Sequence, residues 1–196
     1  LNQPHHDDID ARIKISIGTI QEGRDDGVFY EPRGLVFDHH RDLLMVVDYN
    51  NHRVQVFSCE EGFSFVSKFG EYGHQPGQLH NPWGLAIDHD HDRILIVDRF
   101  NNRVQSWSLS NQSFLSSIGH QGSGDLEFDC PHGIAIDNHH RRIIIPDAYN
   151  NRLVFLSSID LSFLFEIGSK GSRPGEFSWP SGIAIDHDRC RIIVSD

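Results

Sequence analysis

The sequence repeats itself four times, and this periodicity constrains the fold more than any other feature of the chain. A Pro-x-Gly step, a short apolar run and an aspartate recur as PRGLVFD, PWGLAID, PHGIAID and PSGIAID, beginning at Pro32, Pro82, Pro131 and Pro180. The repeated prolines are 50, 49 and 49 residues apart. A period of about 20 to 50 residues is typical of one supersecondary unit stacked on copies of itself. The sequence therefore predicts a tandem-repeat architecture.

A second motif recurs behind the first. Another aspartate lies ten residues after the first one in each repeat, and in three repeats an asparagine and an arginine follow it at fixed spacing. These residues are Asp48, Asn51 and Arg53, then Asp98, Asn101 and Arg103, then Asp147, Asn150 and Arg152. A carboxylate and a guanidinium form charge-assisted hydrogen bonds. Because the trio recurs in three repeats, we interpret it as a structural brace of the loop between the second and third strands, not as a recognition site.

Each repeat contains four strand-like segments and no helical periodicity. In the first repeat, residues 35–37 and 43–47 are nearly continuous apolar runs, which are typical of strands covered on both faces. Residues 53–57 alternate, and residues 63–69 are mixed and aromatic. Four strands joined by hairpins predict one blade of a β-propeller. We expect Gly34, Gly84, Gly133 and Gly182 to start the innermost strands, where backbones crowd together.

The two motifs together resemble the NHL repeat, and the resemblance extends over the chain from residue 11 onward. It implies an all-β, NHL-type β-propeller of four-stranded antiparallel blades, six of which form the ring in that family. A six-bladed ring at this period needs about 290 residues, so we expect an incomplete arc of about four blades from a larger protein. The alternative is a four-bladed ring, closed by an N-terminal strand that joins the last half-blade.

The predicted organisation follows the repeats. It comprises a leader at 1–10, an outer strand at 11–17, blades at 29–69, 79–118 and 128–167, and a half-blade at 177–196, so that the propeller fragment spans 11–196.

Composition limits the classes of partner and the compartment. The chain has 17 Lys and Arg against 28 Asp and Glu, a formal net charge of -11, whereas nucleic-acid binders normally present a basic field. RNA binding is therefore disfavoured, although Arg33, Arg53, Arg99 and Arg103 recur near the same end of the blades. No apolar run approaches the roughly 20 residues of a membrane span. Three cysteines without zinc-ligand spacing predict reduced thiols and a cytoplasmic location.

Many of the 14 histidines fall in the turns between first and second strands, which have the sequences DHHRD, DHDHD, DNHHR and DHDRC. A pair such as His89 and His91, flanked by acidic residues, suits zinc, copper or nickel. A structural zinc site needs four converging ligands, however, and we expect turns on different blades to lie too far apart to share an ion. The sequence therefore predicts weak, incidental metal affinity, with no dedicated metal site and no cofactor.

Positions that vary inside the fixed motifs are the candidates for binding. One set of candidates follows each motif proline, and another follows each second aspartate. Strand order places both sets at the same end of the blades, beside the connections at 73–81 and 122–130. Variable loops on a rigid scaffold are typical of binding platforms, and aromatic residues and arginine are frequent at protein interfaces. The predicted binding residues are Arg33, Tyr49, Trp83, Arg99, His132 and Tyr149.

The resemblance implies three kinds of function. Tripartite-motif ubiquitin ligases use an NHL propeller to select a protein or RNA target, and bacterial receptor kinases carry one outside the membrane. Related six-bladed lyases and hydrolases, of the peptidyl-amidating lyase and gluconolactonase types, hold a metal near the channel with His and acidic side chains. Here His132 lies near the channel entry, but Arg33, Trp83 and Ser181 provide no matching ligand. We predict a non-enzymatic scaffold that binds a protein or peptide; RNA binding is the first alternative and a metal-dependent lyase or hydrolase the second.

Overall fold

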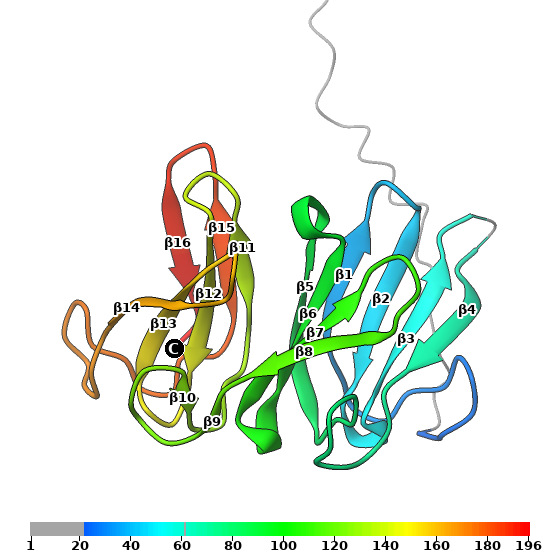
Figure 1. Cartoon of the computed structure of the whole chain (residues 1–196), viewed down its shortest axis with the longest axis horizontal. Helices are drawn as coiled ribbons and strands as arrows, with labels where there is room; N and C mark the ends of the chain where they lie inside the picture. The colour runs from blue at the N-terminus through cyan, green and yellow to red at the C-terminus, as the bar shows by residue number, and fades with distance from the viewer. Residues whose placement is uncertain (1–21, 61) are drawn as a thin grey trace, which may run out of the picture.

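The computed structural model describes residues 22–60 and 62–196, and its strands confirm the predicted all-β fold. Three antiparallel sheets of four strands follow one another along the chain, and a two-stranded antiparallel sheet comes last (Figure 1). Within each of these sheets the strands are neighbours in chain order, as in a propeller blade. The predicted leader and outer strand lie outside the described residues, so the four-bladed ring that this strand would close stays a prediction.

The sheets recur with the period of the sequence. The first contains β1 (Pro32–Asp38), β2 (Leu43–Asp48), β3 (Arg53–Ser58) and β4 (Ser64–Phe69). The second contains β5 (Pro82–Asp88), β6 (Arg93–Asp98), β7 (Arg103–Ser108) and β8 (Phe114–Ile118). The third contains β11 (Ala135–Asp137), β12 (Arg142–Asp147), β13 (Arg152–Ser157) and β14 (Phe163–Ile167). The last contains β15 (Ile183–Asp186) and β16 (Arg191–Val194).

The hydrophobic core lies between successive sheets. Along β6, Ile94 and Ile96 pack in a cluster shared with the first sheet, whereas Leu95 and Val97 pack in a cluster shared with the third. All four side chains are completely buried. Because successive side chains of a strand point to opposite faces, a strand covered on both sides must be apolar at every position. This packing explains the continuous apolar runs of the second strands.

The innermost strands approach one another closely at the motif glycines. A Cβ atom on Gly34 would lie 2.6 Å from the carbonyl oxygen of Trp83, and one on Gly84 would lie 2.8 Å from that of His132. A Cβ on Gly133 would lie 2.6 Å from the carbonyl oxygen of Ser181. The predicted crowding of backbones is therefore confirmed at these three glycines, where only glycine fits without displacing the next blade. A Cβ on Gly182 would instead meet the Ser195 side chain, at 2.9 Å, and no backbone of another blade.

The connections between sheets contain pairings that the sequence did not predict. β9 (His120–Gln121) pairs in parallel with β10 (Glu127–Phe128), and single parallel bridges join Tyr72 to Leu79 and Lys170 to Phe177. Each connection therefore folds back on itself between two blades.

Helical structure in the described residues is short. The 3-10 helices η1 (Tyr49–Asn51), η2 (His89–His91) and η3 (Arg99–Asn101) each follow directly on a strand. No helix of the described part is long and apolar enough to cross a membrane.

Candidate functional site

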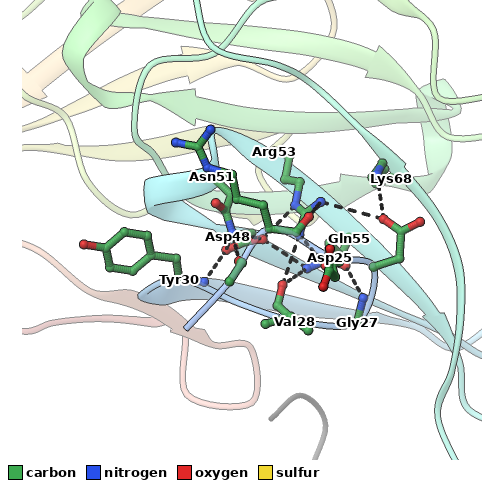
Figure 2. A network of polar contacts seen from close by, with 12 residues as sticks. Asp25, Gly27, Val28, Tyr30, Asp48, Asn51, Arg53, Gln55 and Lys68 are labelled. Atoms are coloured by element: carbon green, nitrogen blue, oxygen red, sulfur yellow. Dashed lines mark hydrogen bonds and ion pairs between the residues drawn. The ribbon is translucent and has the colours of Figure 1, made fainter. Parts of the chain in front are cut away.

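The aspartate, asparagine and arginine of the second motif form a buried polar network, shown for the first sheet in Figure 2. Asp48 Oδ2 accepts hydrogen bonds from Arg53 Nε at 2.8 Å and Asn51 Nδ2 at 2.9 Å. Gln55 Nε2 donates to the same oxygen at 3.0 Å, and the Tyr30 amide donates to Oδ1 at 2.8 Å. Asp48 is completely buried and Arg53 nearly so. A buried ion pair is stable only when its remaining polar atoms are also bonded, and these donors meet that need.

The arginine of this network also holds the connection that leads into its own sheet. In the first sheet, the Arg53 guanidinium donates to the carbonyl oxygens of Arg24, Asp25 and Val28. Arg103 binds the carbonyls of His74, Gln75 and Gln78, and Arg152 those of Ser123, Gly124 and Glu127. The geometry is that of a brace, but it ties down the incoming connection as well as the loop between the second and third strands. The spacing of the aspartate, asparagine and arginine can be recognised in the sequence. The carbonyl groups that the arginine binds, more than 20 residues earlier in the chain, cannot be recognised in this way.

Five of the six predicted binding residues lie together at the end of the sheets where the innermost strands begin. We call Arg33, Tyr49, Trp83, Arg99 and His132 the arginine–aromatic cluster.

The centre of this cluster is the indole of Trp83. The ring of His132 stacks on it, with centroids 4.4 Å apart and an interplanar angle of 14°. The guanidinium carbons of Arg33 and Arg99 lie 4.6 and 5.0 Å from the indole centroid, within the range of cation–π attraction. Side chains from three successive blades therefore meet at one aromatic ring.

Tyr49 joins the cluster from the first blade. Its ring meets the Trp83 indole edge-on at 5.5 Å, and its hydroxyl accepts a hydrogen bond of 2.8 Å from Arg99 Nη1. Arg33 is exposed and donates to Glu31 at 3.1 Å. Arg99 Nε is buried and has no hydrogen-bond partner among the described residues. The two guanidinium groups are thus positioned by aromatic rings, and only Arg33 is paired with a carboxylate of the described chain.

His132 is a buried polar group of the cluster. It is 8% exposed, and neither ring nitrogen has a hydrogen-bond partner within the described residues. Burial, together with the positive charges of Arg99 and Arg33, lowers the pKa of His132 to about 4. The imidazole is therefore neutral at physiological pH, which favours its stacking between blades.

The sixth predicted residue, Tyr149, lies elsewhere. Its exposed ring stacks on Trp179 at 5.8 Å and 26°, and within the described part of the chain it makes no aromatic contact with Trp83. Trp179 is 63% exposed and was not predicted from the sequence. The signal that identifies it is its place directly before the fourth motif proline. Tyr149 and Trp179 form a second aromatic surface.

A groove runs beside the arginine–aromatic cluster along the innermost strands. Its volume is about 410 Å³, and its walls include Arg33, Trp83, Ile134 and Ser181. The motif glycines line the same groove, so backbone is accessible between the side chains. A groove of this size, with apolar, aromatic and cationic walls, lies within the usual volume range of ligand pockets.

The expectation that histidine turns of different blades lie too far apart is wrong for the first two blades. His89 does not act together with His91, whose Nδ1 instead lies 3.0 Å from Asp88 of its own blade. His89 points to the preceding blade, where Nε2 lies 3.8 Å from Asp38 Oδ1 and its ring lies 4.2 Å from that of His40. The expectation failed because the turns of packed blades lie side by side, whereas the two histidines of one turn diverge.

Comparison with known proteins supports the architecture. A family model described as a 6-bladed beta-propeller matches residues 34–122. A comparison with curated protein sequences finds no match. The matching model does not name the NHL repeat, so that finer assignment stays a prediction.

Many solved structures match this fold, including the following three. Hydrazine synthase of Kuenenia stuttgartiensis superposes with a TM-score of 0.63 at 12% identity, over 87% of this chain and 43% of that one. A nidogen/laminin complex gives 0.62 at 16% identity, over 84% and 56%. Dihydro-heme d1 dehydrogenase NirN in complex with DHE gives 0.57 at 17% identity, over 83% and 32%. The chain spans at most 56% of the length of these three structures, and the likeness establishes the β-propeller fold alone.

Proposed function

We propose that this chain is a non-enzymatic interaction scaffold whose arginine–aromatic cluster and adjoining groove bind a protein or peptide partner. The observation that carries the proposal is the convergence of side chains from three blades on the indole of Trp83. Trp, Tyr and Arg are the residue types that contribute most to binding at protein interfaces. A propeller in a nidogen/laminin complex is among the structures of similar fold, which is a precedent for protein binding by this architecture.

The arginines indicate the chemistry of the partner. Within the described residues, Arg99 uses Nη1 for the Tyr49 hydroxyl and forms no ion pair, and Arg33 has only Glu31 as an acidic neighbour. Two guanidinium groups over one indole are well placed to bind a carboxylate in a partly desolvated setting. We therefore propose an extended peptide with an acidic side chain as the preferred ligand.

RNA is the weaker alternative. Bases bound without duplex structure stack on aromatic rings that are free on at least one face. Trp83 is already stacked on His132 and contacted by two guanidinium groups, and the formal net charge of the chain is -11. These features favour a peptide over a polyanion gathered by a broad basic field.

The finer assignment is also part of the proposal. Because both motifs resemble the NHL repeat, we propose an NHL-type propeller that works in the cytoplasm and selects substrates for a ubiquitin ligase. The free cysteines Cys59, Cys130 and Cys190 agree with a reducing compartment.

A peptide-display selection tests the proposal. Random peptides are selected on the immobilised 196-residue chain, and the enriched peptides are synthesised and titrated against it. We expect acidic peptides with dissociation constants on the order of micromolar. The double variant Arg33→Ala, Arg99→Ala should weaken binding at least about tenfold, a loss of about 1.4 kcal/mol.

The matched control is Arg141→Ala, which removes one exposed arginine at the opposite end of the third sheet. It should bind the selected peptides as the unchanged chain does. An equal loss of peptide affinity in the control and the double variant would mean that the peptides respond only to the overall charge of the chain. If the selection enriches no peptide, that result would count against the proposed scaffold. Retention of a short single-stranded RNA in a gel shift, abolished by the double variant, would favour the RNA alternative.

A further inference from the structure

We propose that Asp38, His40 and His89 form a divalent transition-metal site that links the first two blades at the end opposite to the arginine–aromatic cluster. One ligand atom from each residue lies within 4.8 Å of the other two. Asp38 and His40 come from the turn after β1, and His89 from the turn after β5, so a bound ion would join two separate hairpins. The site is independent of the proposed peptide-binding groove.

Asp38 is held in the orientation that a ligand needs. Its Oδ2 accepts a hydrogen bond of 3.1 Å from Arg41 Nη1, and its Oδ1 accepts one of 3.0 Å from the His40 amide and faces His89 Nε2. A ligand carboxylate fixed in this way by an outer partner binds a metal more tightly. Although burial opposes ionisation, the bonds from Arg41 and the His40 amide lower the pKa of Asp38 overall. The carboxylate is therefore ionised and preorganised.

The two imidazoles supply the rest of the site. His40 and His89 are exposed, whereas Asp38 is buried. Ligand atoms of a tetrahedral zinc ion lie about 3.3 Å apart, given zinc–ligand distances near 2.0–2.2 Å. The exposed rings have room in the solvent to rotate to that separation. Two imidazoles and one carboxylate are a common ligand set for zinc, with the fourth position left to water.

The neighbouring junctions provide an internal comparison. At the junction of the second and third blades, the positions of His40 and His89 are taken by Asp90 and Asn138, so the donor set is absent there. At the junction of the third and fourth blades they are taken by His139 and His187, which line one small cavity with Asp137. Within the described residues, Asp38, His40 and His89 are the only group of three or more His, Cys, Asp or Glu side chains whose ligand atoms all lie within 4.8 Å of one another. The structure thus assigns the site to one junction.

Calorimetric titration of the metal-free chain with Zn²⁺ tests the site. We expect an equivalent of zinc whose binding depends on His40 and His89, and a melting temperature that rises with zinc because metal binds only the folded state. His89→Asn gives this position the residue that the third blade has. It should weaken the zinc affinity at least about tenfold and remove the zinc-dependent rise in melting temperature. His40→Asn should act in the same way.

His91→Asn is the matched control, because it removes a histidine from the same turn as His89 without touching the proposed ligands. His5 and His6 lie outside the described residues, and comparison between variants cancels any zinc that they bind. Circular dichroism verifies that each variant is folded. Zinc affinity that is the same in His89→Asn as in His91→Asn, or a melting temperature that zinc does not raise in the unchanged chain, would overturn the site.

Discussion

At the scale of single residues, one buried aspartate organises each brace. Asp98 accepts hydrogen bonds from Arg103 Nε at 2.7 Å and from Asn101 Nδ2 at 2.8 Å, while the His80 amide donates to it at 2.7 Å. Gln105 adds another donor to the same carboxylate, at 2.9 Å. Removal of one partner from such a network leaves the other charge buried and unpaired, and that penalty exceeds the value of any single bond.

Arg103→Ala is therefore expected to lower the free energy of unfolding by about 3–5 kcal/mol. The variant strands the Asp98 charge and frees three carbonyl oxygens of the preceding connection. Urea denaturation followed by tryptophan fluorescence measures the change. Arg99→Ala, which removes a guanidinium outside the brace, should cost much less; a stability of Arg103→Ala within 1 kcal/mol of the unchanged chain would show that the brace is not structural.

His132 gives the fold a specific pH dependence. Its pKa in the folded chain is about 4, lowered by burial and by Arg99 and Arg33, whereas an unfolded histidine titrates near 6.5. The unfolded chain therefore binds more protons between these values, and stability falls as the pH drops from about 6.5 to 4.

We expect protonation linked to His132 to lower the free energy of unfolding by about 1–3 kcal/mol between about pH 6.5 and pH 4. His132→Phe keeps an aromatic ring against Trp83 but cannot be protonated. Urea denaturation at a series of pH values should show a flatter acid limb for the variant. An acid limb identical to that of the unchanged chain would indicate that His132 is not the group responsible.

At the scale of elements, successive blades are joined by hydrogen bonds from backbone amides to side chains of the preceding blade, as well as by apolar packing. The Asn81 amide donates to His52 Nδ1 at 3.0 Å, and the Cys130 amide donates to Asn102 Oδ1 at 2.8 Å. The Trp179 amide donates to Asn151 Oδ1 at 3.2 Å. In each case the acceptor is the residue directly after the asparagine of the second motif, and the donor is the residue directly before the next motif proline. These bonds fix where the next innermost strand begins, and the motif glycines allow neighbouring innermost strands to lie in contact.

Gly84→Ala tests this contact. The added Cβ would lie 2.8 Å from the carbonyl oxygen of His132 in the next blade, and backbone cannot yield as a side chain can. We expect a loss of about 1–3 kcal/mol, as for other overpacked sites, measured by thermal and urea unfolding. Gly124→Ala is the control, because the atoms nearest to its Cβ would be side-chain atoms of Glu127, at 3.2 Å, and not backbone of another blade; equal losses in the two variants would contradict the close approach of blades.

At the scale of the whole molecule, the sequence predicts the strands of each blade better than the contacts between neighbouring blades. Regularly spaced Pro, Gly and Asp identify the strands because each repeat satisfies the same local requirements. The cluster around Trp83 could be predicted in part, since strand order places Arg33, Trp83 and His132 at one end. Trp179 and the pairing of His40 with His89 were missed, because they depend on how far each turn reaches toward its neighbour. Packing between blades determines the distance from each turn to the neighbouring blade, and the spacing of residues within one repeat does not predict this distance.

A partner that binds across the innermost strands at the arginine–aromatic cluster should shield the backbone amides there from solvent. Hydrogen–deuterium exchange of the chain, with and without a peptide from the selection, measures this most directly. We expect slower amide exchange in residues 30–34, 80–84 and 131–133 when the peptide is bound, and no change in the turns at 39–42 and 89–92. Protection confined to those turns, or to the surface of Tyr149 and Trp179, would contradict this expectation.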